Sequence, residues 1–77
     1  MKTIITFGTF DVFHIGHLRI LQRAGQLGDR LIVGISSDAL NMQKKGRVPV
    51  YSQSDRMGII AGLKCVDSVF LEESLEQ

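Results

Sequence analysis

Three short apolar runs divide this chain, and two segments with helical spacing separate the runs. Residues 2–7, 31–35 and 66–71 are rich in apolar and β-branched side chains without regular polar alternation, which is typical of buried strands. Between them, apolar positions recur three and four residues apart over 16–27 and 52–64, which predicts two amphipathic helices. The order strand, helix, strand, helix, strand predicts an α/β fold with a parallel sheet and right-handed crossovers.

The expected helix ends carry recognisable signals. Gly28 follows the first helical segment and predicts its C-terminal stop. Ser52 stands three residues before Asp55, a weak form of the capping box, and predicts the start of the second helix. The intervening segment, 36–51, is polar and basic and contains the single proline. We therefore expect a loop there, with no more than a short helical turn begun at 37–38.

Composition places the chain among small globular domains. Its 77 residues are 44% hydrophobic and 22% charged, and no apolar run approaches the ~20 residues of a membrane span. We therefore expect one domain over residues 1–77, of marginal stability and without a membrane segment. The single cysteine, Cys65, excludes an internal disulfide, fits a reducing cytoplasm and is expected to be a buried small residue rather than a nucleophile. The acidic tail, 72–77, could begin a further helix.

The strand ends indicate where the chemistry should lie. Ligands of parallel α/β sheets bind beyond the carboxyl ends of the strands, which here are residues 8–11, 36–38 and the region after Leu71. The stretch from Gly8 to His17 joins the first strand to the first helix and contains two glycines, an aspartate and two histidines. The unpaired N–H groups and the partial positive charge of a helix start suit a phosphate.

His14 and His17 are the candidate phosphate ligands. They lie three residues apart, so both side chains point the same way once the first helical turn forms. Imidazoles in this place can donate hydrogen bonds to phosphate oxygens whose charge grows during phosphoryl transfer. Two alternatives are a zinc site, for which Asp11 is the nearest further ligand, and a purely structural pair of histidines. The combination with Gly8 and Gly16, which allow a ligand to approach the backbone closely, favours phosphate.

Charge is unevenly distributed along the second half of the chain. Residues 39–64 contain five basic side chains and one acidic one, whereas residues 65–77 contain four acids and no base. Lys44, Lys45 and Arg47 follow the end of the second strand and face the expected ligand crevice, which favours an anionic ligand over a solvated surface. Nucleic acid is not expected, because the net charge is only +1 and aromatic stacking residues are few.

The ten residues from Gly8 to His17 have the pattern Gly-Thr-Phe-Asp-x-x-His-x-Gly-His. This pattern resembles the nucleotidyltransferase superfamily with the His-x-Gly-His hallmark. Within that superfamily it is similar to the cytidylyltransferases, above all the bacterial glycerol-3-phosphate cytidylyltransferases. The resemblance continues through 36–38, 41–44 and Arg56 into the third strand. It implies a Rossmann-like (HUP-type) fold, of which this chain would hold the first part, β-α-β-α-β.

The resemblance also implies roles for individual residues. His14 and His17 would bind the triphosphate and stabilise the transition state, and Lys44 would act on the phosphorylated acceptor and the transferred phosphate. Asp11 matches an acidic position of the site and could either hold a metal or orient its neighbours. Arg56 matches a helix arginine that helps to build the site, and no residue is assigned to a metal. The implied nucleotide-binding residues are Gly8, Thr9, Phe10, Asp11, His14, Gly16, His17 and Arg56.

The implied reaction is the transfer of CMP from CTP to a phosphorylated alcohol such as glycerol-3-phosphate, with release of pyrophosphate. Mg²⁺ would accompany the triphosphate, and the resemblance implies a cytoplasmic homodimer. ATP in place of CTP is an open alternative. The family's second nucleotide motif, an Arg-Thr-x-Gly-Ile-Ser-Thr-like segment, has no counterpart up to Gln77, so we expect an incomplete domain. A further alternative is therefore a truncated, non-catalytic chain that binds a nucleotide or associates with itself.

Overall fold

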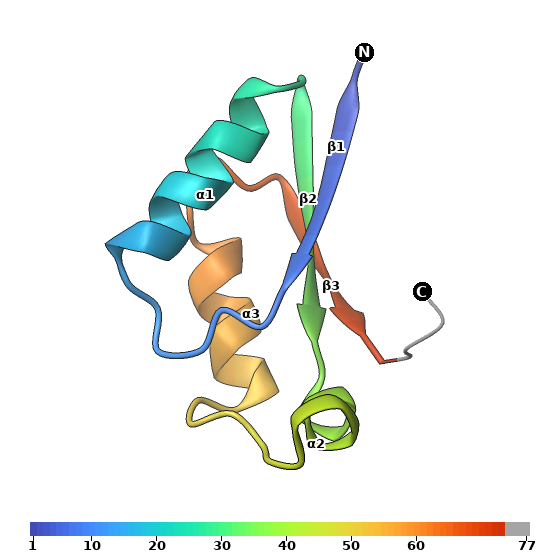
Figure 1. Ribbon diagram of the computed structural model, residues 1–77. Coiled ribbons are helices and arrows are strands. Elements are labelled where there is room, and N and C mark those ends of the chain that lie inside the picture. The colour runs from blue at the N-terminus through green and yellow to red at the C-terminus, as the bar shows by residue number, and fades with distance from the viewer. Residues whose placement is uncertain (74–77) are drawn as a thin grey trace.

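The three predicted strands form one parallel sheet in the computed structural model, which describes residues 1–73 (Figure 1). The central strand pairs with both others, with Thr3 opposite Arg30 on one side and Ile32 opposite Ser68 on the other. Along the chain the elements are β1 (Thr3–Gly8), α1 (Ile15–Gln26), β2 (Arg30–Ser36), α2 (Asp38–Lys45), α3 (Gln53–Ala61) and β3 (Ser68–Glu72). The sheet order β1-β2-β3 confirms the predicted parallel α/β fold.

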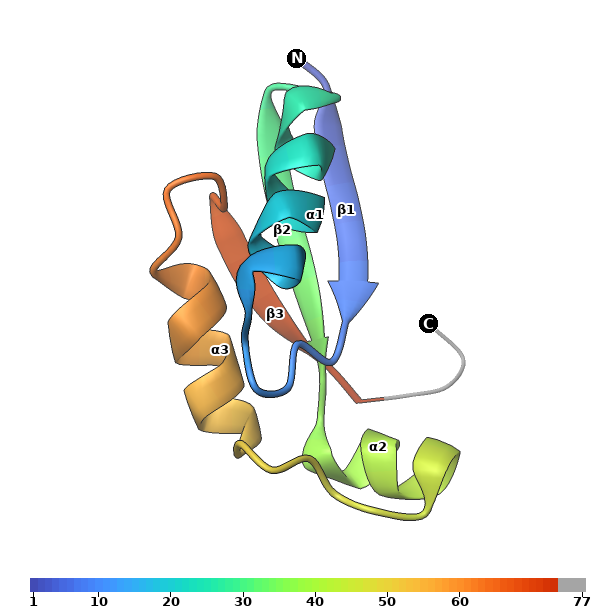
Figure 2. The same cartoon turned by 60° about the vertical axis from the view of Figure 1, so that its left-hand side comes forward.

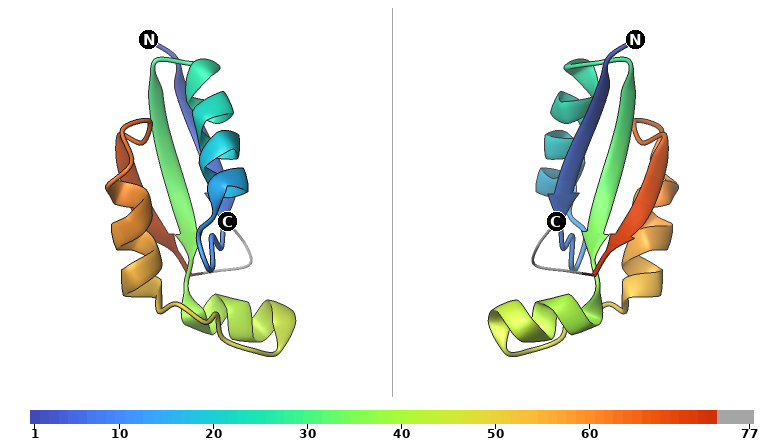
Figure 3. Two further views of the ribbon diagram at one scale, coloured as in Figure 1. Left: turned by 90° about the vertical axis from the view of Figure 1, so that its left-hand side faces the viewer. Right: turned by 90° about the vertical axis from the view of Figure 1, so that its right-hand side faces the viewer.

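Both crossover helices lie on the same face of the sheet. Helix α1 connects β1 to β2, α3 follows β2 and leads to β3, and the two helices lie along the sheet (Figure 2). The right-hand view of Figure 3 has the strands in front and both helices behind, so within residues 1–73 no helix covers the opposite face. On that face Phe7 is 50% exposed, and its ring meets that of Phe70 edge-on over Gly34, with 5.7 Å between the centroids. No helix of the described part is long and apolar enough to cross a membrane.

The hydrophobic core lies between the sheet and these two helices. Leu21 of α1 and Ile60 of α3 are both fully buried. Burial of such a side chain contributes about 1.5–3 kcal/mol. Cys65, predicted to be buried, is only partly buried and packs against the same cluster. The buried partners on β2 are Leu31, Val33 and Ile35.

The segment between β2 and α3 differs from the prediction of a loop with a short turn, because eight of its residues form helix α2. Ser37 is the N-cap, and its Oγ accepts a hydrogen bond from the N–H of Leu40 at 2.9 Å. Gly46 ends the helix in the left-handed conformation, with φ of 73°. These end signals are present in the sequence, but the helix buries only Leu40 and Asn41, so it has almost no apolar pattern to reveal it.

Helix α3 is shorter than predicted at its C-terminal end. It ends at Ala61 rather than at residue 64. Gly62 is the C-cap, and its N–H donates to the carbonyls of Gly58 and Ile59, so the last turn closes there. The low helix propensity of glycine explains the early end.

Strand β3 starts later than predicted, at Ser68 rather than at residue 66. The carboxylate of Asp67 accepts a hydrogen bond from the N–H of Leu31 at 2.7 Å, and the Asp67 N–H donates to the Leu31 carbonyl at 2.9 Å. This side chain therefore guides the chain into the sheet before the ladder begins. Glu72, where a further helix was expected to begin, is instead the last residue of β3. The rest of that expected helix, 74–77, lies outside the described residues.

Candidate functional site

The segments that follow β1 and β2 meet at one end of the sheet. The β1–α1 loop, helix α2 and the α2–α3 loop gather at the carboxyl ends of the strands, in the lower part of Figure 1. Two neighbouring cavities of about 330 and 440 Å³ open there, and both are lined by Thr9, Asp11 and Lys45. Such volumes fall in the range of small-molecule sites. A candidate site therefore lies where the topology of a parallel sheet predicts it.

The β1–α1 loop has an unusual backbone. Phe10 and Val12 have φ values of 54° and 46°, in the left-handed region that non-glycine residues seldom adopt. Phe10 is held there by burial in the core, and the Val12 N–H donates to Asp11 Oδ1 at 3.1 Å. A residue in such a conformation costs about 1–3 kcal/mol, and residues of this kind cluster at functional sites. Phe10 also lines the second cavity, beside Gly8.

The two histidines begin helix α1 as a capping box. His14 is the N-cap, and its Nδ1 accepts a hydrogen bond from the N–H of Gly16 at 3.0 Å. In return, Nδ1 of His17 accepts a hydrogen bond from the N–H of His14 at 3.3 Å. The rings stack with 4.0 Å between their centroids. Because each Nδ1 is an acceptor, the proton of a neutral ring lies on Nε2, so both rings can donate from the atom farther from the backbone.

Close packing within the motif accounts for both of its glycines. A Cβ at Gly16 would lie 2.7 Å from Cε1 of His14, so the His14 ring would have to move. A Cβ at Gly8 would lie 2.6 Å from the ring of Phe10. Gly8 also lines the second cavity, and the close approach of a ligand to the two glycines stays a prediction.

His17 is biased towards its neutral form. Burial of the ring, together with the charge of the neighbouring His14, lowers the pKa of His17 below its ordinary value of 6.5. The rings of Phe10 and Phe13 lie beside it, with centroids 5.6 and 5.5 Å away. At neutral pH, His17 is therefore a neutral imidazole that can donate through Nε2 and does not repel His14.

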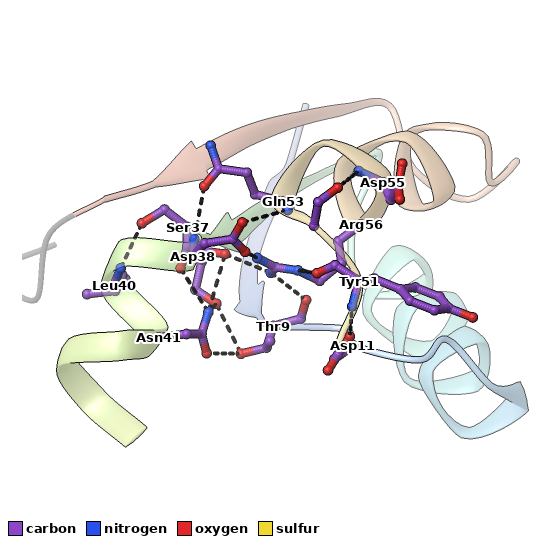
Figure 4. A network of polar contacts seen from close by, with 12 residues as sticks. Thr9, Asp11, Ser37, Asp38, Leu40, Asn41, Tyr51, Gln53, Asp55 and Arg56 are labelled. Carbon is purple, nitrogen blue, oxygen red and sulfur yellow. Dashed lines mark hydrogen bonds and ion pairs between the residues drawn. The ribbon is translucent and has the colours of Figure 1, made fainter. Parts of the chain in front are cut away.

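Arg56 joins four segments of the site from a fully buried position, with 0% of its side chain exposed. Its Nη1 donates to the carbonyls of Thr9 at 3.0 Å and Ser36 at 2.7 Å (Figure 4). Its Nε donates to the carbonyl of Tyr51 at 3.1 Å, and its Nη2 forms an ion pair with Asp38 at 2.7 Å. The predicted role of Arg56 in building the site is consistent with this position, but its guanidinium has no exposed surface for a nucleotide to contact.

Further polar contacts extend this network. Asp38 and Gln53 exchange hydrogen bonds between the starts of α2 and α3, at 2.9 and 3.3 Å. The buried Asn41 donates to Ser36 Oγ at 2.8 Å and accepts from the Thr9 hydroxyl at 3.2 Å. Thr9 is thus fixed through its side chain as well as its carbonyl. Within residues 1–73, no buried polar side-chain atom lacks a partner.

Asp11 faces backbone amides. Its Oδ1 accepts hydrogen bonds from the N–H groups of Val12 at 3.1 Å and Tyr51 at 2.8 Å, and its Oδ2 accepts from Val50 at 2.8 Å. Burial raises the pKa of Asp11, but these hydrogen bonds and the charge of Arg56 outweigh it and bring the pKa below the ordinary value of 3.8. No group of three or more His, Cys, Asp or Glu in the described part of the chain could hold a metal ion, which removes support from the zinc alternative.

The lysine that lines the two cavities is not the one that the resemblance indicated. Lys45 lines both cavities and Arg47 lines the first, whereas Lys44 lines neither. Consecutive residues of an α-helix point about 100° apart, so one lysine at the end of α2 can face the cavities while its neighbour does not. The sequence could not separate the two, because it predicted this segment as a loop.

Comparison with known proteins identifies the family. A family model described as cytidylyltransferase-like matches residues 5–77. The chain belongs to the cytidylyltransferase-like family. The match includes the whole stretch from Gly8 to His17, so the resemblance inferred from that motif is confirmed.

The cytidylyltransferase-like chain has relatives with several printed activities. It is 46% identical over 77 residues to the glycerol-3-phosphate cytidylyltransferase of Bacillus subtilis, covering 100% of this chain and 59% of that protein. It is 39% identical over 70 residues to the FAD synthase of Thermococcus sibiricus, covering 91% of this chain and 47% of that protein. It is 48% identical over 73 residues to the bifunctional protein HldE of Helicobacter pylori, covering 94% of this chain and 16% of that protein. The chain thus spans less than two thirds of each of these relatives.

A solved structure has the same fold. The lipopolysaccharide core biosynthesis protein of Thermoplasma volcanium superimposes with a TM-score of 0.86 at 32% sequence identity. The match covers 94% of this chain and 58% of that protein. The Rossmann-like arrangement expected for a cytidylyltransferase-like chain is therefore confirmed.

Sequence reasoning about this cytidylyltransferase-like site missed residues that organise it through buried hydrogen bonds. The sequence predicted Asp38 only at the start of a short turn and within the resemblance, Asn41 only through the resemblance, and Lys45 only within a basic run. The available signal was the Ser37-Asp38 pair followed by the lysines and Gly46, which together mark a complete short helix. Recognising that helix would have placed Asn41 on its buried side.

We expect Arg56→Met to destabilise the protein by about 3–5 kcal/mol, because it leaves Asp38 and three backbone carbonyls without their shared donor. Urea unfolding followed by circular dichroism measures the change. The exposed Arg19 of α1 provides the matched control, and Arg19→Met should change stability by no more than about 0.5 kcal/mol. Equal effects of the two variants would contradict the structural role of Arg56.

The lowered pKa of His17 predicts a pH dependence of stability. As pH falls from 6.5 towards this lowered pKa, the unfolded chain takes up a proton before the folded one does. The thermal midpoint should therefore fall across this window and stop falling from this cause below it. His17→Asn keeps an acceptor for the His14 N–H but does not titrate, so its midpoint should fall less over the same window. Parallel curves for wild type and variant, measured by differential scanning calorimetry, would exclude this assignment.

Proposed function

We propose that this chain carries the nucleotide-binding part of a nucleotidyltransferase that transfers CMP from CTP to a phosphorylated alcohol such as glycerol-3-phosphate. The observation that carries the proposal is the stacked pair of His14 and His17 at the start of α1, at the end of the sheet where Lys45 and Arg47 line a cavity. Membership of the cytidylyltransferase-like family supports the reaction class. The relationship to a glycerol-3-phosphate cytidylyltransferase supports the choice of CTP and acceptor.

The triphosphate would lie against the start of α1. The helix dipole and the first N–H groups favour an anion there. The Nε2–H groups of His14 and His17 would donate to phosphate oxygens as their negative charge increases, which is where a preorganised donor lowers the barrier most. Lys44, which matches the family's lysine, and Lys45, which lines the cavities, are the candidates for the charge opposite the acceptor phosphate.

The reaction would be a direct in-line displacement. An oxygen of the acceptor phosphate would attack the α-phosphorus of CTP and form a new P–O bond. The bond from the α-phosphorus to the oxygen that bridges it to the β-phosphate would break, and pyrophosphate would leave with that electron pair. Without a covalent enzyme intermediate, the protein contributes by positioning the reactants and stabilising charge.

Mg²⁺ would be held mainly by the triphosphate oxygens. The Asp11 carboxylate already accepts three N–H groups, and residues 1–73 contain no cluster of three or more potential protein ligands. This arrangement fits an ion that binds few protein groups and prefers substrate phosphates and water. When bound, Mg²⁺ would neutralise charge on the phosphates.

ATP is the second candidate nucleotide. One relative is named FAD synthase, and FAD contains an adenine nucleotide, which favours this alternative over other bases. The phosphate-binding groups proposed here would serve either nucleotide, because none of them recognises the base. Pyrophosphate release with CTP or ATP, each in the presence of glycerol-3-phosphate and Mg²⁺, distinguishes the two.

We expect His14→Asn to lower the rate of pyrophosphate release by about 100-fold or more, because one donor to the transition state is lost. Asparagine is a good N-cap residue, so helix α1 should remain intact and the thermal midpoint should change little. Arg19→Gln, on the exposed side of the same helix, is the control and should keep the wild-type rate.

The same assay separates the alternatives to an enzyme. Micromolar binding of CTP by calorimetry without pyrophosphate release would support a non-catalytic nucleotide-binding chain. Absence of both binding and turnover with CTP and ATP would exclude the proposed function for this chain.

The two neighbouring lysines should behave differently. Lys45→Gln is expected to weaken binding of CTP or glycerol-3-phosphate by about tenfold, because a charge-assisted contact is lost. Lys44→Gln should have a smaller effect on the affinity, since Lys44 lines neither cavity. Isothermal titration calorimetry of both variants measures this. A larger effect at Lys44 would show that the family resemblance, rather than the cavity, identifies the functional lysine.

A further inference from the structure

The α2–α3 loop is held to the rest of the domain by very few bonds. Within the described part of the chain, residues 47–51 take part in three hydrogen bonds. The N–H groups of Val50 and Tyr51 donate to Asp11, each at 2.8 Å, and the carbonyl of Tyr51 accepts from Arg56 at 3.1 Å. Asp11 lies 39 and 40 positions before its two partners in sequence, so it fixes the loop to a distant segment. Figure 4 shows Tyr51 between Asp11 and Arg56.

This loop forms one wall of the first cavity. Arg47, Val48, Pro49 and Val50 line that cavity together with Thr9 and Asp11, and Lys45 immediately precedes the loop. The side chains of Val48 and Val50 are exposed, so burial does little to hold the loop in place. The position of Arg47 at the cavity therefore depends on the three hydrogen bonds, whereas Lys45 is placed by helix α2.

The charges around Asp11 also indicate that its carboxylate holds the backbone of the loop. A bare carboxylate in the wall of an anion-binding cavity would repel the anion. Here three N–H dipoles face the two carboxylate oxygens, and Arg56 adds a positive charge nearby, which lowers the pKa of Asp11. The charge thus organises the backbone around it, and both oxygens already accept hydrogen bonds from backbone N–H groups.

We propose that Asp11 is a positioning residue, whose ionised carboxylate holds the α2–α3 loop against the β1–α1 loop so that Arg47 of this loop faces the anion. This inference rests on the proposed function only for the identity of the anion. It decides between the two roles that the sequence left open for Asp11, in favour of orienting its neighbours.

The first test concerns the loop itself. Amide hydrogen exchange, measured by NMR on the free protein, should be faster by about tenfold or more at Val50 and Tyr51 in Asp11→Asn than in the wild type. The amides of β2 should keep their protection in the same sample. Unchanged exchange at Val50 and Tyr51 would overturn the proposal. If Asp11→Asn loses amide protection in the whole domain, Asp11→Glu is measured instead, because it keeps the charge but displaces the carboxylate oxygens from the Val50 and Tyr51 amides. Faster exchange at these two amides alone would then support the proposal.

The second test uses CTP as the probe, by calorimetry in EDTA and again with Mg²⁺. The proposal predicts that Asp11→Asn weakens CTP binding by about tenfold in EDTA, because the loop no longer holds Arg47 at the cavity. Asp55→Asn removes the same charge from an exposed position in the first turn of α3 and should leave the affinity unchanged.

Two other results would overturn the proposal. If Asp11 acted only through its charge, Asp11→Asn would bind CTP more tightly than the wild type. If Asp11 held Mg²⁺, the variant would bind normally in EDTA and lose affinity only with Mg²⁺. If the wild-type protein binds no CTP, the proposed function is refuted. The hydrogen-exchange experiment needs no CTP, so it would still test whether Asp11 holds the loop.

Discussion

The buried guanidinium of Arg56 is the interaction on which the candidate site depends. Its N–H groups meet the carbonyls of Thr9, Ser36 and Tyr51 and the carboxylate of Asp38, which come from the β1–α1 loop, the junction of β2 with α2, and the α2–α3 loop. A buried charge is costly unless it is paired and hydrogen-bonded, so these partners must all be in place at once. The same requirement makes the site a single arrangement: the strand ends, the start of α2 and the α2–α3 loop cannot move independently without leaving a charge unsatisfied.

Around the Arg56 guanidinium, some polar atoms form structural hydrogen bonds while other polar atoms of the same side chains stay available for chemistry. The imidazoles of His14 and His17 cap helix α1 through Nδ1, and this fixes Nε2 as the donor of each neutral ring. The left-handed conformations of Phe10 and Val12 are balanced by core burial and by Asp11. The loop is therefore preorganised by bonds already made in the free protein, which is the condition under which fixed donors are most effective towards a developing charge.

Local sequence patterns predicted the elements whose stability comes from apolar burial. Strand β2 and helices α1 and α3 bury apolar residues, and β1 and β3 pack partly buried ones against them; each was predicted to within a few residues at its ends. Helix α2 escaped prediction because it is held by Ser37, Gly46 and the buried amide of Asn41 rather than by an apolar face. The sequence could not show whether Lys44 or Lys45 lines the cavities for the same reason, since the direction of each side chain depends on the helix that carries it.

The sequence by itself determined the parallel α/β fold, the position of the site at the carboxyl ends of the strands and the family, because these depend on local periodicity and on ten consecutive residues from Gly8 to His17. Only the tertiary structure decided which groups Asp11 and Arg56 contact. Their partners lie up to 47 positions away in sequence, and most of those partners are backbone N–H and carbonyl groups. Every residue except proline offers the same backbone groups, so no side-chain pattern can reveal which of them will meet a buried charge.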